Sequence, residues 1–332
     1  MVISTKLNYP LLLIKHLFSD AHWGEIAAAL SAVLARWPDA VVHLEGIGLV
    51  PLVSGLSSQS VVVTTTDAWS LRQHRLAARA RSWRLRWFLK AYAALSAWVE
   101  RRYFPLAGAV QVVSPVDAAY LRHAVPAARV HVIPIALSSQ PDLRPVRSTV
   151  PMGEPRTVLF WGDIRVAHIA DGLKWLLHEV MPLVEPKARW VVLGRHAPEA
   201  ALQAMAPVVQ FVNWVEDVDR FLQAADVVVL PDAEGTGLKN RAVHAMACGV
   251  PVVGTPSAFE GLAVTDEVEA MVKADAVQFA DGVSRLLVDA GLSERMGQSG
   301  RQFAIEGYSI EAVGKCWSEL YASVTPRSAA TP

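Results

Sequence analysis

The chain has 332 residues, of which 52% are hydrophobic and 19% are charged, and its formal net charge is zero. This composition supplies enough apolar material for two domains and excludes a disordered chain, and the balanced charge argues against nucleic acid as a partner. The two cysteines, Cys248 and Cys316, are far apart and form no disulfide framework, so a reducing compartment is expected.

The apolar run at the N-terminus is short and is interrupted by Lys15 and His16, and no small-residue cleavage site follows it. A signal peptide is therefore not expected. No uninterrupted apolar stretch approaches the ~20 residues that span a bilayer. We expect a cytoplasmic protein, and these features leave open a peripheral position at the inner membrane surface.

Short apolar runs alternate with segments of helical period along the chain. Strands are expected at 40–44, 60–65, 109–113, 130–133, 157–161, 189–193, 208–211, 226–230 and 251–254. Nearly all are apolar throughout rather than alternating, which is typical of parallel strands covered on both faces. The pattern predicts an α/β protein with two Rossmann-like, doubly wound parallel-sheet lobes that face a cleft.

A proline-rich segment without periodicity, at 138–155, divides these elements into two series and predicts a linker. We expect an N-terminal lobe at 1–140, a C-terminal lobe at 156–323 and a flexible tail at 324–332. In such folds, ligands bind beyond the carboxyl ends of the strands.

The most informative segment, residues 227–255, contains a buried strand, a glycine-containing loop, a helix ending near Gly249 and a second buried strand. Gly235 and Gly237 allow a ligand to approach the backbone closely, and the helix that follows offers unpaired N–H groups to an anion. Lys239 adds a positive charge where a phosphate would sit. The alternative is an ordinary strand–helix–strand crossover in which the glycines only turn the chain.

This segment resembles the donor-binding region of GT-B glycosyltransferases of the family-4 type. In that family, G-[S/T]-G-x-K precedes the helix and A-M-A-x-G-x-P-V-V follows it, and here these motifs stand at 235–239 and 245–253. The resemblance covers nearly all of 157–262, in the family's order, with further matching segments at 160–163, 192–195, 211–217 and 259–262.

The resemblance implies a GT-B fold and a retaining, nucleotide-sugar-dependent glycosyltransferase that uses no metal or other cofactor. Lys239 is then expected to hold the donor phosphates and to stabilise the departing diphosphate as a catalytic residue. The donor-binding residues that the resemblance implies are Gly162, Asp163, Arg195, Trp214, Val215, Gly235, Thr236, Gly237, Leu238, Lys239, His244 and Glu260. His244 departs from the family, which has a ribose-binding glutamate there; an imidazole can accept one hydrogen bond and donate another.

The N-terminal lobe lacks the family's opening strand, glycine-rich loop and helix, so about one βαβ unit of ~30 residues is expected to be missing. Polar residues nevertheless follow its strands at their carboxyl ends, and His43, Glu45 and Thr66 are assigned to the acceptor side. Asp67 is the catalytic candidate, as a hydrogen-bond acceptor or base for the incoming hydroxyl. The alternative is that Asp67 caps the following helix.

The segment 71–104 has a helical period, is strongly basic and contains interleaved tryptophans. Such a segment can lie on an anionic membrane, which would suit a lipid-linked acceptor. The alternative is a solvated surface helix whose aromatic side chains pack inward.

Asp217-Val218-Asp219 spells D-x-D, a pattern that can hold a metal, but residues two apart do not share a helix face, so capping and exposure are expected. The histidines show no metal-ligand spacing and Cys248 is expected to serve packing, so no metal is predicted.

We therefore expect transfer of a sugar from a nucleoside diphosphate sugar to a hydroxyl of a saccharide, lipid-linked glycan or small molecule. The alternatives are a non-catalytic subunit that binds a nucleotide or a partner, and a nucleotide-sugar epimerase on the same scaffold.

Overall fold

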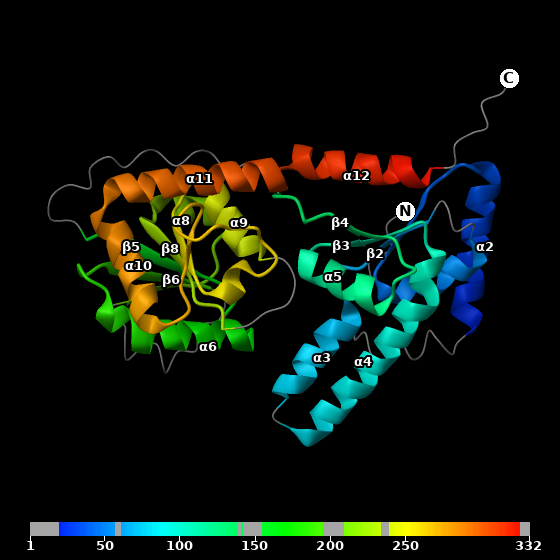
Figure 1. Ribbon diagram of the computed structural model, residues 1–332, viewed down its shortest axis with the longest axis horizontal. Helices are drawn as coiled ribbons and strands as arrows, with labels where there is room; N and C mark the ends of the chain where they lie inside the picture. Colours follow the sequence, from blue (N-terminus) through cyan, green and yellow to red (C-terminus); the bar gives the residue numbers. More distant parts are fainter. Residues whose placement is uncertain are drawn as a thin grey trace. The chain divides into compact units, whose positions relative to one another are not determined.

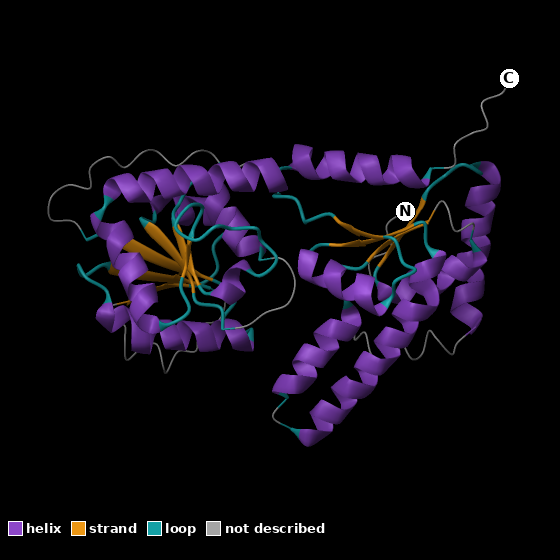
Figure 2. Ribbon diagram, viewed as in Figure 1, coloured by secondary structure: helices purple, strands orange, loops and turns teal. Residues whose placement is uncertain are grey.

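The computed structural model describes residues 20–56, 61–80, 82–138, 141, 155–194, 209–233 and 239–325. The chain divides into two compact units, one of residues 1–134 together with 314–332 and the other of residues 135–313 (Figure 1). Each unit is built on a parallel β-sheet, as expected (Figure 2).

The first unit contains a four-stranded sheet in the order β1-β2-β3-β4, with all pairs parallel. The strands are β1 (Val42–Glu45), β2 (Val61–Thr64), β3 (Ala109–Val112) and β4 (Val130–Val132). The helices are α2 (Asp20–Arg36), the 3₁₀ helices η1 (Ile47–Gly55) and η3 (Phe104–Leu106), α3 (Trp69–Arg79), α4 (Trp83–Tyr103) and α5 (Pro115–Ala124). Because neighbouring strands follow one another in sequence, right-handed crossovers place the connecting helices on one face of the sheet. A single core cluster accordingly joins Val61, Val63 and Val110 to Phe104 and Leu121.

Helices α3 and α4 form a hairpin whose base is joined by buried polar groups (Figure 1). The Glu100 carboxylate accepts hydrogen bonds from the backbone N–H of Ser70, at 3.0 Å, and from its hydroxyl. The Asp117 carboxylate accepts from the backbone N–H of Ala68 at 2.9 Å. These two acids from other helices therefore satisfy N–H groups at the start of α3, which its own helix leaves without partners.

The second unit contains a six-stranded parallel sheet in the order β10-β9-β8-β5-β6-β7. The strands are β5 (Thr157–Trp161), β6 (Arg189–Leu193), β7 (Val209–Val212), β8 (Val227–Leu230), β9 (Val252–Gly254) and β10 (Met271–Val272). The helices are α6 (Ala167–Trp175), the π-helix η4 (Leu176–Val180), the 3₁₀ helices η5 (Met181–Leu183) and η6 (Pro256–Phe259), α8 (Val218–Ala224), α9 (Asn240–Ala247), α10 (Ala276–Val288) and α11 (Ala290–Tyr308). Helix α12 (Ile310–Val324) begins in this unit, but most of its residues belong to the first unit.

The strand order of this sheet reverses beside β5, so helices cover both faces (Figure 2). Successive side chains of a strand point to opposite faces. Val158 and Phe160 of β5 accordingly join one core cluster with Phe279 of α10, whereas Leu159 joins the other with Met246 of α9. Burial on both faces explains why these strands are apolar throughout.

The nine expected strands are all present, with ends shifted by at most two residues. Strand β10 was not expected, because two residues are too short to give a pattern in the sequence. The expected linker lies largely outside the described residues, as do the first 19 residues, so the absence of an opening βαβ unit stays a prediction.

The end of the chain differs from the expected lobe boundary at 323. Residues from Gly314 onward group with the first unit, because α12 brings Trp317 and Tyr321 against His43 of β1. Among the described residues, no helix has the length and apolar character needed to cross a bilayer.

Candidate functional site

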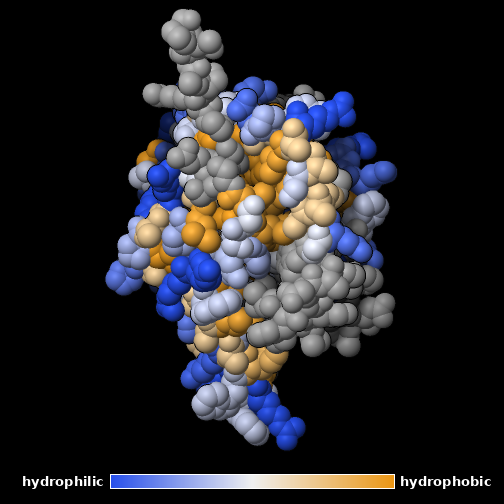
Figure 3. Space-filling model, turned by 90° about the vertical axis from the view of Figure 1, so that its right-hand side faces the viewer, coloured by the Kyte–Doolittle hydropathy of each residue, from blue (hydrophilic) through white to orange (hydrophobic). Residues whose placement is uncertain are grey.

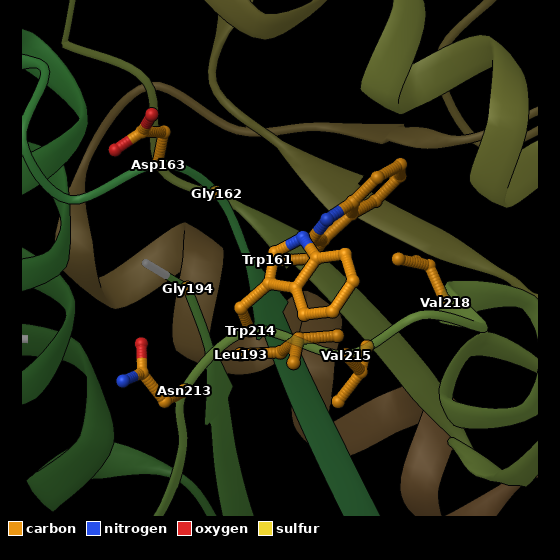
Figure 4. Close-up of a pocket in the computed structure, with 9 residues that line it drawn as sticks. All are labelled: Trp161, Gly162, Asp163, Leu193, Gly194, Asn213, Trp214, Val215 and Val218. Atoms are coloured by element: carbon orange, nitrogen blue, oxygen red, sulfur yellow. The ribbon is translucent and has the colours of Figure 1, made fainter. Parts of the chain in front are cut away.

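A cavity of about 250 Å³ lies at the carboxyl ends of β5, β6 and β7 in the second unit (Figure 4). It is lined by Trp161, Gly162, Asp163, Leu193, Gly194, Asn213, Trp214, Val215 and Val218. The cavity adjoins the reversal of strand order between β5 and β8, which is where doubly wound sheets bind ligands. Gly162, Asp163, Trp214 and Val215, four of the residues expected at the donor site, are thus brought together.

Two glycines form the floor of this cavity. The Gly162 N–H donates to the Leu193 carbonyl at 3.0 Å, and the Gly194 N–H donates to the Val212 carbonyl at 3.1 Å, so the hydrogen bonding continues past the strand ends. A Cβ added at Gly194 would overlap the Gly162 carbonyl oxygen. The close approach of these backbones therefore requires glycine at position 194, which sequence reasoning included only within a matching segment.

The walls of the cavity are chemically divided. In Figure 4, the Asp163 carboxylate and the Asn213 amide lie on the left, above and below Gly194, whereas the Trp161 and Trp214 rings lie at the centre and Val218 lies at the right. Asp163 pairs with Arg165 at 2.6 Å. An apolar, aromatic wall beside a few polar groups suits a ligand with a flat ring and hydrogen-bonding substituents.

An ion pair between a buried aspartate and a partly buried arginine, which sequence reasoning missed, lies beside the cavity. The Arg241 Nη2 atom lies 2.6 and 2.7 Å from the two carboxylate oxygens of Asp232, and Nη1 donates to the Trp161 carbonyl at 2.5 Å. Arg241 thereby links the end of β5, the residue two positions after β8 and the first turn of α9. In the sequence, the signal for this pair was that the oppositely charged residues Asp232 and Arg241 stand on either side of the glycine-containing loop.

His244 lies beside the cavity, and its side chain is held by contacts with Asp219 and Trp161. Its Nε2 is 2.5 Å from Asp219 Oδ1, and its ring meets the Trp161 ring edge to face at 5.4 Å between centroids. Asp217 caps α8 by accepting from the Arg220 N–H at 3.2 Å, as expected. The expectation that Asp219 is an exposed surface acid is wrong, because α8 packs this residue against His244 on α9.

Lys239 occupies the N-cap position of α9, one residue before its first turn, and is half-buried. Glu260 follows η6 and is also half-buried. Five other expected donor residues lie outside the described residues: Arg195, Gly235, Thr236, Gly237 and Leu238.

In the first unit, His43 is held between two hydroxyls. Its Nδ1 lies 2.8 Å from the Tyr321 hydroxyl and its Nε2 lies 2.6 Å from the Thr64 hydroxyl, and Trp317 packs against the ring. Burial lowers the pKa of His43, and the negative charge of Glu45 opposes this shift. His43 is thus a positioned, neutral hydrogen-bonding group at the carboxyl end of β1.

The other expected residues of the first unit lie close to this edge. Glu45 and Thr66 are exposed. Asp67 is 3.6 Å from Arg72, and its backbone carbonyl accepts from the Thr65 hydroxyl at 2.7 Å. The alternative that Asp67 caps α3 is wrong, because the cap residue is Ala68 and the acids at the helix start are Asp117 and Glu100.

Cys248 is fully buried at the end of α9. Burial and, to a smaller extent, the charge of Asp219 raise the pKa of this thiol to about 12. By itself the thiol is therefore protonated and unreactive, in keeping with the expected packing role.

Two α/β units, each on a parallel sheet and with a cavity at the carboxyl edge of the second, give this chain the GT-B fold. Sucrose-phosphate synthase from Thermosynechococcus elongatus has a TM-score of 0.70 at 20% identity, over 96% of this chain and 81% of that one. HepE from Anabaena, solved in complex with UDP, has a TM-score of 0.63 at 13% identity, over 90% of this chain and 82% of that one. WaaG, described as a glycosyltransferase involved in lipopolysaccharide biosynthesis, has a TM-score of 0.61 at 15% identity, over 96% of this chain and 85% of that one.

The second unit also carries a family signature in its sequence. Residues 155–289 match the family described as "Glycosyl transferases group 1". Over 117 residues it is 29% identical to the lipopolysaccharide core biosynthesis glycosyltransferase LpsE of Rhizobium meliloti, which covers 35% of this chain and 34% of that protein. The chain thus matches about a third of the length of this curated relative.

Proposed function

We propose that this protein transfers a sugar from a nucleoside diphosphate sugar to an acceptor hydroxyl, with retention of the anomeric configuration. The observation that carries the proposal is the glycine-floored cavity beside the switch point of the second sheet. Its tryptophan wall suits a nucleobase, and Asp163 and Asn213 offer hydrogen bonds to it or to the ribose. The family match and the UDP found in HepE support a nucleotide as the ligand.

Lys239 is the residue proposed to meet the diphosphate. It stands at the N-cap of α9, where the positive end of the helix and the ammonium group add to one another. The Nε2 of His244 faces Asp219, which leaves Nδ1 as the nitrogen to meet a donor hydroxyl. Catalysis would come from orientation and from charge stabilisation of the leaving diphosphate, with Asp67 proposed to accept the hydroxyl proton.

A panel of UDP-, GDP-, ADP- and dTDP-sugars in a thermal-shift measurement tests the donor site without knowledge of the acceptor, because a bound ligand raises the melting temperature. We expect one nucleotide class to raise it, and Lys239→Ala to reduce both this shift and the rate of donor turnover, the latter by roughly 10²-fold. Lys174→Ala is the matched control, since this exposed lysine of α6 pairs with the equally exposed Asp171 of the same helix.

The outcomes separate the alternatives. Absence of a shift with every donor overturns the proposal. A shift without hydrolysis or transfer favours a non-catalytic nucleotide-binding subunit, and conversion of the donor sugar in the absence of an acceptor favours an epimerase. Equal shifts in Lys239→Ala and wild type remove Lys239 from the site.

We further infer that the α3–α4 hairpin contacts an anionic membrane and brings the enzyme to a lipid-linked acceptor. An outward stripe of α4 is apolar along its length and consists of Trp83, Trp87, Ala91, Ala94 and Trp98. Trp83 and Trp87 are each 67% exposed, so the alternative that the aromatic side chains pack inward does not hold for them. Exposed apolar surface of this kind marks an interaction site.

Basic residues border this stripe on both sides. From the helical step of about 100° per residue, Arg84 and Arg102 lie along one border and Arg86 and Lys90 along the other. In Figure 3, the end of the hairpin extends downward, and strongly hydrophilic residues lie there beside residues of intermediate hydropathy. Aromatic side chains bordered by positive charge match the interface of an anionic bilayer.

Co-sedimentation with vesicles of phosphatidylglycerol and phosphatidylcholine tests this inference against vesicles of phosphatidylcholine alone. Each basic side chain near an anionic surface contributes about 1 kcal/mol, so Arg84→Ala/Arg86→Ala should weaken binding roughly 30-fold. Trp83→Ala/Trp87→Ala should also weaken it, whereas Trp37→Ala, which removes an exposed tryptophan after α2, should not. Equal binding to both vesicle types, or by all variants, would overturn the inference.

A further inference from the structure

Three side chains with different donor atoms meet between α8 and α9. Asp219 belongs to the first turn of α8, His244 to the last turn of α9, and Cys248 is the residue that follows α9. A carboxylate oxygen, an imidazole nitrogen and the thiol sulfur of these residues all lie within 4.8 Å of one another. Residues four apart share a helix face, which explains why His244 and Cys248 point to the same place.

We propose that Asp219, His244 and Cys248 form a binding site for a divalent transition metal ion of the zinc type. One oxygen, one nitrogen and one sulfur donor are the ligand set that this borderline-soft ion accepts, whereas magnesium and calcium require oxygen donors. Zinc bonds of about 2.0–2.3 Å in a tetrahedron hold ligand atoms roughly 3.3–3.8 Å apart. The side chains would therefore need to move by only about 1 Å, with Asp219 and His244 separating from their present 2.5 Å.

The charge of the cluster suits a dication. The carboxylate and the thiolate together supply two negative charges, and metal binding releases the thiol proton. Arg301 approaches this end of α9, but its Nη1 atom donates to the backbone carbonyls of Ala247 and Pro141. The Asp219 carboxylate, by contrast, pairs with His244.

The cluster is also accessible from one side. Cys248 is fully buried, whereas the side chains of Asp219 and His244 are 30% and 21% exposed. An ion can thus enter past these two ligands, and water can supply the fourth position of a tetrahedral site. None of the three residues lines the glycine-floored cavity, although His244 is also proposed to meet the donor through its Nδ1. The test of the metal site uses no nucleotide, so its result does not depend on donor binding.

Titration of the reduced, metal-stripped full chain with Co²⁺ tests the site directly, because a cobalt–thiolate bond gives a charge-transfer band and a tetrahedral site gives strong visible bands. We expect one equivalent to produce both, and one equivalent of Zn²⁺ to abolish them. Cys248→Ser should lose the charge-transfer band, and Asp219→Asn should weaken the metal affinity by about tenfold or more. Cys316→Ser is the matched control, because it removes the only other cysteine, which is exposed on α12.

Cys248→Ser and Asp219→Asn each replace a side chain by one of nearly the same shape. Circular dichroism and the melting temperature without metal verify that each variant folds. Zn²⁺ should raise the melting temperature of the wild type and of Cys316→Ser, and should raise it less in Cys248→Ser and Asp219→Asn. The proposal is overturned if no charge-transfer band forms, if the band persists in Cys248→Ser, or if all four proteins bind the ion equally.

Discussion

The carboxyl edges of the two sheets carry different kinds of residue. In the second unit, Gly162 and Gly194 come directly after β5 and β6, and the space that their missing side chains leave is a cavity. In the first unit, polar side chains stand at the corresponding edge, and His43 and Thr64 bind each other there. The difference indicates that two glycines packed against each other at neighbouring strand ends leave open space, whereas polar side chains at strand ends fill it and hold one another in place.

Loss of the ion pair below the cavity should have the largest effect on the second unit. Arg241→Met leaves the Asp232 carboxylate, whose side chain is 4% exposed, without its partner. Because Arg241 itself is 20% exposed, we expect the low end of the usual range, about 3 kcal/mol lost from the free energy of unfolding, measured in urea. Asp232→Asn/Arg241→Met should recover part of this loss, and a loss below about 1 kcal/mol in the single variant would contradict the linking role of the pair.

Glycines from the two units provide a matched pair of substitutions. Gly194→Ala should lower the free energy of unfolding by about 1–3 kcal/mol and narrow the cavity, because the new methyl group overlaps the Gly162 carbonyl. A Cβ at Gly48 of η1 meets no atom within 4 Å, so Gly48→Ala should change stability by less than about 1 kcal/mol. Equal losses in the two variants would show that the floor of the cavity can move aside.

The smallest effect is a dependence of stability on pH that arises at the edge of the first sheet. The folded-state pKa of His43 is lowered by burial, so the unfolded chain takes up its proton first as the pH falls below the ordinary value of about 6.5. Stability from this residue is present at neutral pH and is lost as the pH falls from that value toward the folded pKa.

Urea unfolding at several pH values should reveal this loss as a slope of the free energy of unfolding against pH, and His43→Asn should make this slope smaller. The slope should not vanish, because burial and the charge of Arg122 also lower the pKa of His131. An unchanged slope in His43→Asn would show that burial does not lower the pKa of this imidazole.

Much of this architecture could be predicted from the sequence, because it depends on properties that each segment carries by itself. Val158, Leu159 and Phe160 are apolar in succession, which indicates a strand covered on both faces before either face is known. The position of Gly162 after its strand could likewise be predicted, because its place in a matching motif is visible in the sequence, and its role in donor binding stays a prediction.

Other features were decided only by the tertiary structure. Asp219 and His244 are 25 residues apart, and His43 and Tyr321 are 278 apart. No local period relates such residues, because their contact depends on the rotation of a helix about its axis and on which helices pack together. The sequence thus determined the sheets and the glycines at their edge, and packing between helices decided which polar side chains became partners.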